Sequence, residues 1–303
     1  MVKLTEKQGG LLMLELKNVS KHFGKVRAAE NLSFNLKKGE VFGFIGPNGA
    51  GKSTTIRMII GALKPTQGEI LYAGKNIKKN KKYIENIAYV PGDVNLWGNL
   101  TGEEVINFMM KTRGYENNEE KCRLIDKFKL DGSKKSKTYS KGNRQKVALI
   151  SAFLSDAELL IFDEPTTGLD PLMERVFHEE VIQAKNAGKT ILLSSHILSE
   201  VEKLADRIAI IRNGKIIESG SMAELRHITR MEYIIDTDDD ITALKHRSFV
   251  HEFSESPDGY HLFIDNEKIP EFLKYLKLYN LKSLTTAPPR LEDIFMRYYE
   301  DSQ

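Results

Sequence analysis

The stretch that decides the fold is Gly46-Pro47-Asn48-Gly49-Ala50-Gly51-Lys52-Ser53, which fits the phosphate-loop pattern G-x-x-x-x-G-K-[ST]. The apolar run Val41 to Ile45 precedes it and indicates a buried strand, and a helical pattern follows it until Leu63-Lys64-Pro65 forbids continuation. Glycines let the chain curl, so that successive N–H groups and the start of a helix at Ser53 point at phosphate oxygens. A Gly-rich turn without a ligand is the alternative.

This loop predicts specific contacts to a triphosphate and its metal. Lys52 is expected to neutralise the β- and γ-phosphates, and the Ser53 hydroxyl is expected to bind Mg²⁺. The residues expected to contact the nucleotide here are Gly46, Pro47, Asn48, Gly49, Ala50, Gly51, Lys52, Ser53 and Thr54.

Two more apolar runs end in polar residues that suit the same chemistry. Leu159 to Phe162 leads into Asp163 and Glu164, which we expect to hold the Mg²⁺ shell and to polarise the attacking water, respectively. A pair of acids that only caps a helix is the alternative. Ile191 to Leu193 leads to His196, which we expect near the γ-phosphate, against the simpler reading of a structural or surface histidine.

Composition divides the 303-residue chain into two parts. Residues 1–220 carry a net charge of +9 and residues 221–303 a net charge of −6, which places a boundary near 220. Leu14 to Leu16 and Leu32 to Leu36 alternate like strands of an antiparallel edge sheet, and Arg207 to Ile211 and Lys215 to Glu218 read as a hairpin.

Residues 99–155 read as an inserted helical subdomain. Val105, Ile106, Phe108 and Met109 are expected on one buried face, and Cys122, Ile125 and Phe128 on another. The remaining part predicts a small α+β domain. Its strands are expected near residues 233–236, 250–253 and 260–264, its helices over 270–279 and after Pro288-Pro289.

Overall sequence properties exclude several classes of protein. No apolar stretch is long enough to span a bilayer and no secretory signal is evident, so any membrane role is expected to come through a partner. The single cysteine, Cys122, cannot form an internal disulfide. The run Lys75, Lys78, Lys79, Lys81 and Lys82 reads as a solvated face, with nucleic acid or acidic lipid headgroups as alternatives.

Taken together, the motifs resemble those of ABC-type ATPases across residues 14–220. Tyr139 to Lys146 resembles the family signature Leu-Ser-Gly-Gly-Gln before a helix, and Gly168-Leu169-Asp170-Pro171 resembles the D-loop. The resemblance implies a P-loop NTPase core over residues 12–220, with an antiparallel β edge subdomain and a helical subdomain over about 95–155. A small α+β domain follows over 221–303.

The resemblance also implies roles for residues outside the phosphate loop. Phe23 is similar to the aromatic residue that stacks on adenine, against the alternative of simple burial. Ser140 and Gly142 imply a second anion cradle, which in the family serves the nucleotide of the opposite subunit. Two ATP molecules would then lie in the interface of a symmetric pair.

The sequence departs from the family pattern at three places. Lys141 occupies the position of the first glycine of the signature, and Asn143 replaces its glutamine. Tyr89-Val90-Pro91-Gly92-Asp93 resembles the Q-loop but has Gly92 in place of glutamine. Asp93 could reach the metal or its water, or the role could be absent.

The resemblance finally implies partners. Val94, Leu96 and Trp97 fall where family members receive a helix of the membrane subunit, although packing within the helical subdomain is equally compatible. The tail with Arg290 to Phe295 resembles the C-terminal extension of bacterial drug, antibiotic and sodium exporters of this class. These features imply a homodimer or a pairing with a close relative. The pair would lie at the inner face of the cell membrane beneath a separate permease, without nucleic acid. An ATPase acting on nucleic acid or the ribosome, and a non-hydrolysing switch, are the alternatives.

Overall fold

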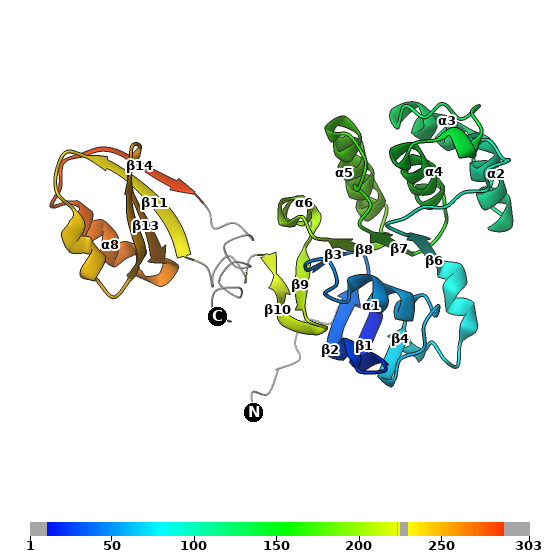
Figure 1. Cartoon of the computed structure of the whole chain (residues 1–303), viewed down its shortest axis with the longest axis horizontal. Coiled ribbons are helices and arrows are strands. Elements are labelled where there is room, and N and C mark those ends of the chain that lie inside the picture. The colour runs from blue at the N-terminus through cyan, green and yellow to red at the C-terminus, as the bar shows by residue number, and fades with distance from the viewer. Residues whose placement is uncertain (1–10, 223, 225–229, 288–303) are drawn as a thin grey trace. The chain divides into compact units, whose positions relative to one another are not determined.

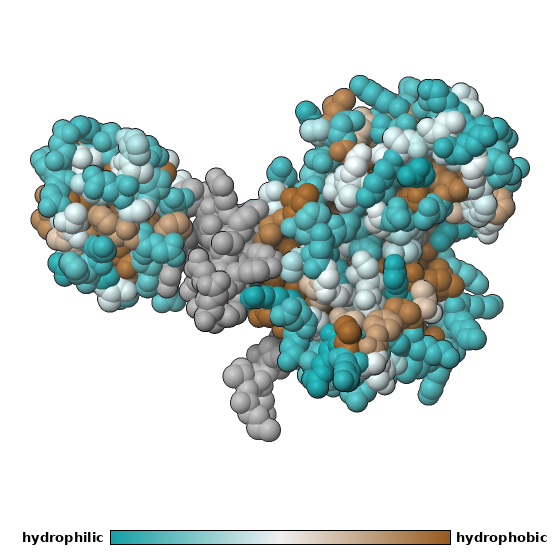
Figure 2. Space-filling model, viewed as in Figure 1, coloured by the Kyte–Doolittle hydropathy of each residue, from teal (hydrophilic) through white to brown (hydrophobic). Residues whose placement is uncertain are grey.

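The computed structural model describes residues 11–222, 224 and 230–287 (Figure 1). The chain divides between Ser219 and Gly220 into two compact units. On the face that Figure 2 shows, hydrophilic residues cover most of both units, with hydrophobic residues in small groups between them. Among the described residues, no helix is both long and apolar enough to cross a bilayer. The expected last helix and the exporter-like tail at residues 290–295 lie outside the described residues.

A six-stranded sheet with the strand order β10-β9-β3-β8-β7-β6 forms the centre of the first unit (Figure 1). The strands β3 (Val41–Ile45), β7 (Leu159–Asp163) and β8 (Thr190–Ser195) are buried along their whole length. Continuous apolar runs of this kind suit a parallel sheet covered on both faces. The three strands are parallel neighbours, so their carboxyl ends meet at one edge.

Other strands complete this sheet. The strand β6 (Ile87–Val90) pairs in parallel with β7, and β9 (Arg207–Arg212) pairs in parallel with β3. The strand β10 (Lys215–Ser221) lies beside β9 after a two-residue turn in which Asn213 and Gly214 both have positive φ. This is the geometry of a tight hairpin, which agrees with the expectation from sequence.

An antiparallel sheet of order β2-β1-β4-β5 packs beside the central sheet. It contains β1 (Leu12–Phe23), β2 (Val26–Lys37), β4 (Gln67–Tyr72) and β5 (Lys75–Asn76). The helix α1 (Lys52–Ile59) contacts both β2 and β7, and its buried residues Ile56 and Ile59 join the core that the two sheets share. The helix begins one residue earlier than expected and ends well before Pro65.

Three helices form the helical subdomain: α2 (Gly102–Thr112), α3 (Asn118–Lys127) and α4 (Lys141–Phe153). The expected apolar faces were partly wrong. Val105, Ile106 and Met110 are buried in α2, whereas Phe108 and Met109 are exposed. In α3 Leu124 is buried, and Phe128 at its C-terminal end is buried as expected, whereas Ile125 is only partly buried and Cys122 is exposed. The packing of α2 and α3 on α4 fixes which residues point inward.

Two helices cover one face of the central sheet. The helix α5 (Pro171–Asn186) packs on β8, and α6 (Leu198–Leu204) packs on β3 and β8. Asp170 caps α5 by accepting a hydrogen bond from the Met173 N–H at 3.0 Å. Between β5 and β6 lies a short 3₁₀ helix, η1 (Lys81–Asn86).

The second unit is a four-stranded antiparallel sheet of order β12-β13-β11-β14 with a helix on one face (Figure 1). The strands are β11 (Arg230–Thr237), β12 (Val250–Ser256), β13 (Gly259–Asp265) and β14 (Leu281–Ala287). The helix α8 (Ile269–Leu276) buries Phe272 against Tyr233, with ring centroids 4.8 Å apart. A 3₁₀ helix over Thr242–His246 closes the core with Leu244.

Candidate nucleotide-binding site

The phosphate loop curls between β3 and α1 as its glycines require. Gly51 has φ +112°, and a Cβ there would lie 2.3 Å from the Ala28 carbonyl oxygen, so only glycine fits. A hollow of about 410 Å³ lies over the loop. Its lining includes the expected nucleotide contacts Asn48, Gly49, Gly51, Lys52, Ser53 and Thr54 and the expected catalytic residue Glu164. Residues 26–28 and 213–214 also line it and were not identified from the sequence.

Lys52 lies at the base of this hollow with only 5% of its surface exposed. Its Nζ donates to the Gly46 carbonyl at 2.6 Å and to the Pro47 carbonyl at 3.2 Å, and forms an ion pair with Glu164 Oε1 at 3.0 Å. A buried ammonium needs such partners because the loss of water is costly. The ammonium is therefore held by carbonyls of the phosphate loop itself, between the end of β3 and the start of α1.

Glu164 joins the three strand ends into one cluster. It follows β7 with φ +53°, in the left-handed region, and its N–H donates to the Ser194 carbonyl at 3.1 Å. One carboxylate oxygen contacts Lys52 and the other contacts His196 Nδ1. Backbone strain of this kind, about 1–3 kcal/mol, persists where surrounding contacts fix it.

Asp163 is the last residue of β7 and is almost fully buried. Its carboxylate accepts a hydrogen bond from the Ser194 hydroxyl at 2.5 Å, which fixes its direction. The sequence-predicted residues Lys52, Asp163, Glu164 and His196 therefore lie together at one sheet edge.

A further acid supports this edge and was not identified from the sequence. Glu200, in the first turn of α6, is buried and accepts hydrogen bonds from Thr166 Oγ1 at 3.0 Å and Ser195 Oγ at 3.3 Å. Burial raises the pKa of Glu200, and Glu174 adds to the rise, whereas its hydrogen bonds and His196 oppose it. Its position four residues after His196 was the only available signal. Glu200 ties the loop after Glu164 to the strand that carries His196.

The two residues placed near the site by resemblance have different surroundings. Phe23, at the end of β1, is 48% exposed, which rules out simple burial, and the Lys21 Nζ lies 5.0 Å from its ring centroid. Asp93 is exposed. A Cβ on its neighbour Gly92 would lie 3.1 Å from the Asp163 carbonyl oxygen and 3.5 Å from Glu164 Cβ. The Q-loop-like turn thus contacts the acidic strand end through its backbone.

The signature-like segment lies at the start of α4. Ser140 is exposed and caps this helix by accepting a hydrogen bond from the Asn143 N–H at 3.3 Å. A Cβ on Gly142 would lie 2.4 Å from the Gly168 carbonyl oxygen, so this position requires glycine for its contact with the D-loop-like turn. Neither Ser140 nor Gly142 lines the hollow over the phosphate loop.

A second hollow, of about 250 Å³, lies between β6 and the helical subdomain. Leu96 and Met109 line it together with the buried Val94. Trp97 does not line it but packs edge-to-face on Phe108 at 5.2 Å, and nearly half of each aromatic side chain is exposed. Ordinary packing therefore accounts for the burial of Val94, whereas Trp97 lies at the surface.

Comparison with known proteins gives the family. The profile described as ABC transporter matches residues 29–167. YhaQ of Bacillus subtilis, described as an uncharacterized ABC transporter ATP-binding protein, is 34% identical over 292 residues, spanning 94% of this chain and 97% of the relative. The bacitracin transport ATP-binding protein BcrA of Bacillus licheniformis is 35% identical over 260 residues, spanning 82% and 83%.

A solved structure gives the same assignment. The ATP-binding cassette MJ0796, described as a dimer in a post-hydrolysis state bound to ADP and Pi, aligns with a TM-score of 0.62 and 25% identity. The alignment covers 69% of this chain and 99% of the cassette. With a phosphate loop, an acidic strand end and a histidine meeting at one sheet edge, the chain belongs to the family of ABC transporter ATP-binding proteins.

Proposed function

We propose that this chain is the ATP-binding and ATP-hydrolysing subunit of an ABC exporter, and that it acts as a pair beneath a separate transmembrane permease. The observation that carries the proposal is the contact of Glu164 with both Lys52 and His196 beside the phosphate loop. This arrangement puts a carboxylate base, a cation for phosphate charge and an imidazole within one cluster, which suits phosphoryl transfer to water.

Lys52 and Glu164 have linked roles in the proposed mechanism. The β- and γ-phosphates of ATP offer Lys52 stronger anionic partners than Glu164 does, so nucleotide binding transfers the ammonium from the carboxylate to the phosphates. Glu164 is then free to accept a proton from the attacking water, while His196 holds its second oxygen in place. Glu200 positions the strand end that carries His196.

The donor set beside the loop fits Mg²⁺. Magnesium prefers oxygen ligands and is commonly held by one or two protein groups together with phosphate oxygens and water. Ser53 lines the hollow, and the Asp163 carboxylate is buried and directed by Ser194. We assign these two residues to the metal, which would neutralise charge on the β- and γ-phosphates. The exposed Asp93 is the weaker candidate and would act through water.

Pairing completes the site in this proposal. Ser140 and Gly142 lie at the N-terminus of α4 and outside the chain's own phosphate hollow, which suits groups that serve a nucleotide held by another copy or a close relative. Phe23 is exposed at a strand end, as a stacking platform for adenine must be. MJ0796, the similar cassette, has been described as a dimer.

The permease is expected to contact the hollow of Val94, Leu96 and Met109. An apolar concavity beside the exposed pair Trp97 and Phe108 suits a short amphipathic helix. It adjoins Gly92, whose backbone touches the acidic strand end, so a shift there can reach the permease. BcrA is named for bacitracin transport, which supports a transport role for this subunit. We place the subunit at the cytoplasmic face of the membrane.

Glu164→Gln tests the proposal directly. The substitution keeps the shape but removes the base and the anionic partner of Lys52. Steady-state ATP hydrolysis by the purified protein should fall at least about 100-fold, whereas ATP affinity, measured by calorimetry, should hold or rise. Hydrolysis at the wild-type rate would remove Glu164 from the catalytic role. As a matched control, Glu158→Gln changes an exposed acid before β7 and should leave both quantities unchanged.

A further inference from the structure

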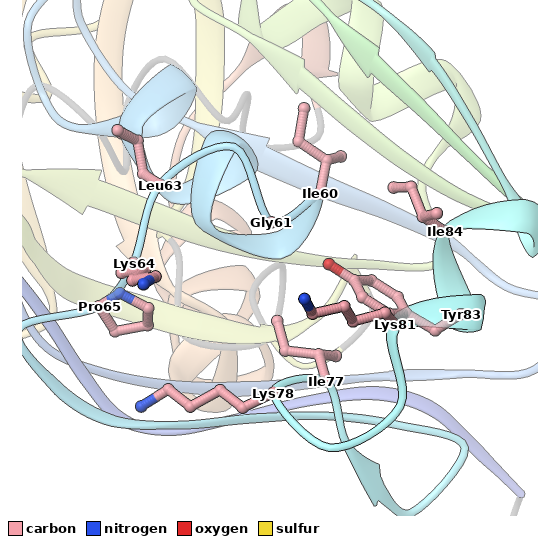
Figure 3. A pocket seen from close by; sticks show the side chains of 10 residues that line it. All are labelled: Ile60, Gly61, Leu63, Lys64, Pro65, Ile77, Lys78, Lys81, Tyr83 and Ile84. Atoms are coloured by element: carbon pink, nitrogen blue, oxygen red, sulfur yellow. The ribbon is translucent and has the colours of Figure 1, made fainter.

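A cavity of about 540 Å³, larger than the hollow over the phosphate loop, lies where α1 ends. It is formed by the turn after α1, the segment after β5 and the 3₁₀ helix η1. In Figure 3 the cavity lies between Gly61 and Ile77, with Tyr83 at one end and Pro65 at the other. No step of the proposed ATPase mechanism uses it.

The walls of this cavity are apolar. Ile60, Leu63, Ile77 and Ile84 contribute aliphatic side chains, and Ile84 is 41% exposed. The Tyr83 hydroxyl is already satisfied, because it donates to the Ile59 carbonyl at 2.8 Å, so its ring serves as an apolar wall. Pockets of this size and polarity are typical of small-ligand sites.

Unpaired cations surround the apolar walls. Lys64, Lys78 and Lys81 line the cavity, and Lys75, Lys79 and Lys82 are close in sequence; all six are exposed. No ion pair joins any of these lysines to an acid among residues 11–222, 224 and 230–287. The nearby acids are Glu69, whose carboxylate accepts from the Asn76 amide at 3.0 Å, and the exposed Glu85. By contrast, Lys121 and Lys127 of the helical subdomain are both paired with glutamates.

We propose that this lysine-rimmed cavity binds an anionic lipid, with an acyl chain against the isoleucines and the headgroup phosphate against Lys64, Lys78 and Lys81. A purely anionic ligand would leave the apolar walls unused, and a purely apolar one would gain nothing from the lysines. Clusters of basic residues bind anionic leaflets at about 1 kcal/mol per residue, and buried CH₂ groups add to this.

The location agrees with this choice of ligand. The helix η1 carries Tyr83 and Ile84 into the cavity and continues directly into β6, which carries Ala88 and Tyr89 into the proposed permease hollow. Arg113 of the helical subdomain donates to the Ile87 carbonyl at 2.5 Å and to the Glu85 carbonyl at 3.2 Å, which fixes η1 next to that hollow. The step from cavity to membrane rests on the proposed function, since a permease there would bring the bilayer close.

Vesicle binding by the purified full-length protein tests the proposal. Phosphatidylcholine vesicles with added phosphatidylglycerol should sediment the protein, whereas pure phosphatidylcholine should not. Lys78→Gln/Lys81→Gln should weaken binding about 30-fold, and Ile84→Ser, which changes no charge, should also weaken it. Lys274→Gln/Lys277→Gln removes the same charge from the second unit and should have no effect. Equal loss in this control pair would contradict a specific site.

Competition identifies the ligand chemistry. Decyl phosphate should displace the protein from vesicles, and inorganic phosphate at the same concentration should not; displacement by both would overturn the acyl-chain contact. Displacement by an acidic peptide but not by decyl phosphate would assign the cavity to a protein partner and refute the proposal. ATP hydrolysis without vesicles should be unchanged in Lys78→Gln/Lys81→Gln, so this result is independent of the Glu164→Gln outcome.

Discussion

Lys52 and Glu164 form an ion pair that connects the phosphate loop to the acidic strand end. Each side chain is positioned by its backbone rather than by a long flexible loop, since Lys52 begins α1 and Glu164 follows β7. Groups held in this way lose little entropy when substrate binds, which favours catalysis. The pair also means that ATP must compete with a carboxylate for the buried ammonium of Lys52.

Lys52→Ala should therefore remove ATP binding. Truncating one partner of a buried, hydrogen-bonded charge pair costs about 2–5 kcal/mol, so ATP affinity should fall at least about 30-fold. Fluorescent-nucleotide titration measures this directly. Lys38→Ala is a matched control, because Lys38 forms only a half-exposed ion pair with Glu158. An unchanged affinity in Lys52→Ala would exclude the phosphate contact.

The raised pKa of Glu200 predicts that the free energy of unfolding depends on pH. Its pKa in the folded chain is raised above 4.5 by burial, so the folded state binds the proton more tightly than the unfolded state. The contribution of Glu200 to stability is thus full below pH 4.5 and is lost as pH rises through the raised pKa. Relative to wild type, Glu200→Gln should gain stability across that window. Urea unfolding at a series of pH values measures the difference, and parallel curves for both proteins would contradict the assignment.

At the scale of elements, a buried carboxylate joins the helical subdomain to the sheet. Glu180 of α5 has a side chain only 3% exposed and accepts hydrogen bonds from Arg123 and Lys127, which belong to α3. Burial alone would raise the pKa of Glu180, but the hydrogen bonds from Arg123 and Lys127 outweigh it and lower the pKa. Stability from this contact is present above pH 4.5 and is lost as pH falls through the lowered pKa.

Glu180→Gln should lower the free energy of unfolding by about 1–3 kcal/mol, less than for a fully buried pair because Arg123 remains partly hydrated. Urea denaturation near neutral pH measures this effect. The neighbouring Glu179→Gln alters a half-exposed acid that pairs with Lys127 and Arg175, and should cost under about 0.5 kcal/mol. If the two variants lost the same stability, the contact of Glu180 with Arg123 and Lys127 would contribute no more than a surface ion pair.

Some elements could be predicted from sequence because their signals are local. The strands β3, β7 and β8 were predicted since each is a continuous apolar run, and the phosphate loop was predicted from its glycines and Lys52. The strands β4, β6 and β14 were missed. The strand β6 has only four residues at the sheet edge, and β14 has mostly exposed residues from Lys282 to Thr286. Their pairing depends on partners far along the chain.

The site was predicted in its parts but not in its contacts. Each of Lys52, Glu164 and His196 follows its own strand, so the sequence indicated the edge on which they lie. The double contact of Glu164 requires the order β3-β8-β7, which no local pattern specifies. Glu200 was missed for the same reason, since its carboxylate matters only once α6 has packed on β3 and β8.

At the scale of the whole molecule, the position of Ser140 outside the phosphate hollow leads to a complementation test. If each nucleotide lies between one copy's Lys52 and the other copy's Ser140, then Lys52→Ala and Ser140→Arg should each abolish ATP hydrolysis alone. In a mixed pair, one site carries both defects and the other carries none. Mixing the two inactive proteins should therefore restore activity.

Random pairing of equal amounts gives up to about a quarter of the wild-type sites, which sets the upper limit of the recovered rate. Hydrolysis should also rise more steeply than linearly with protein concentration in the range where copies begin to associate, because a lone copy lacks half of each site.

Mixing either variant with Glu164→Gln distinguishes the two defects. Glu164→Gln shares its defective half with Lys52→Ala, so that mixture should stay inactive, whereas Glu164→Gln with Ser140→Arg should recover. Recovery in both mixtures, or in neither, would show that hydrolysis does not use the two halves as assigned.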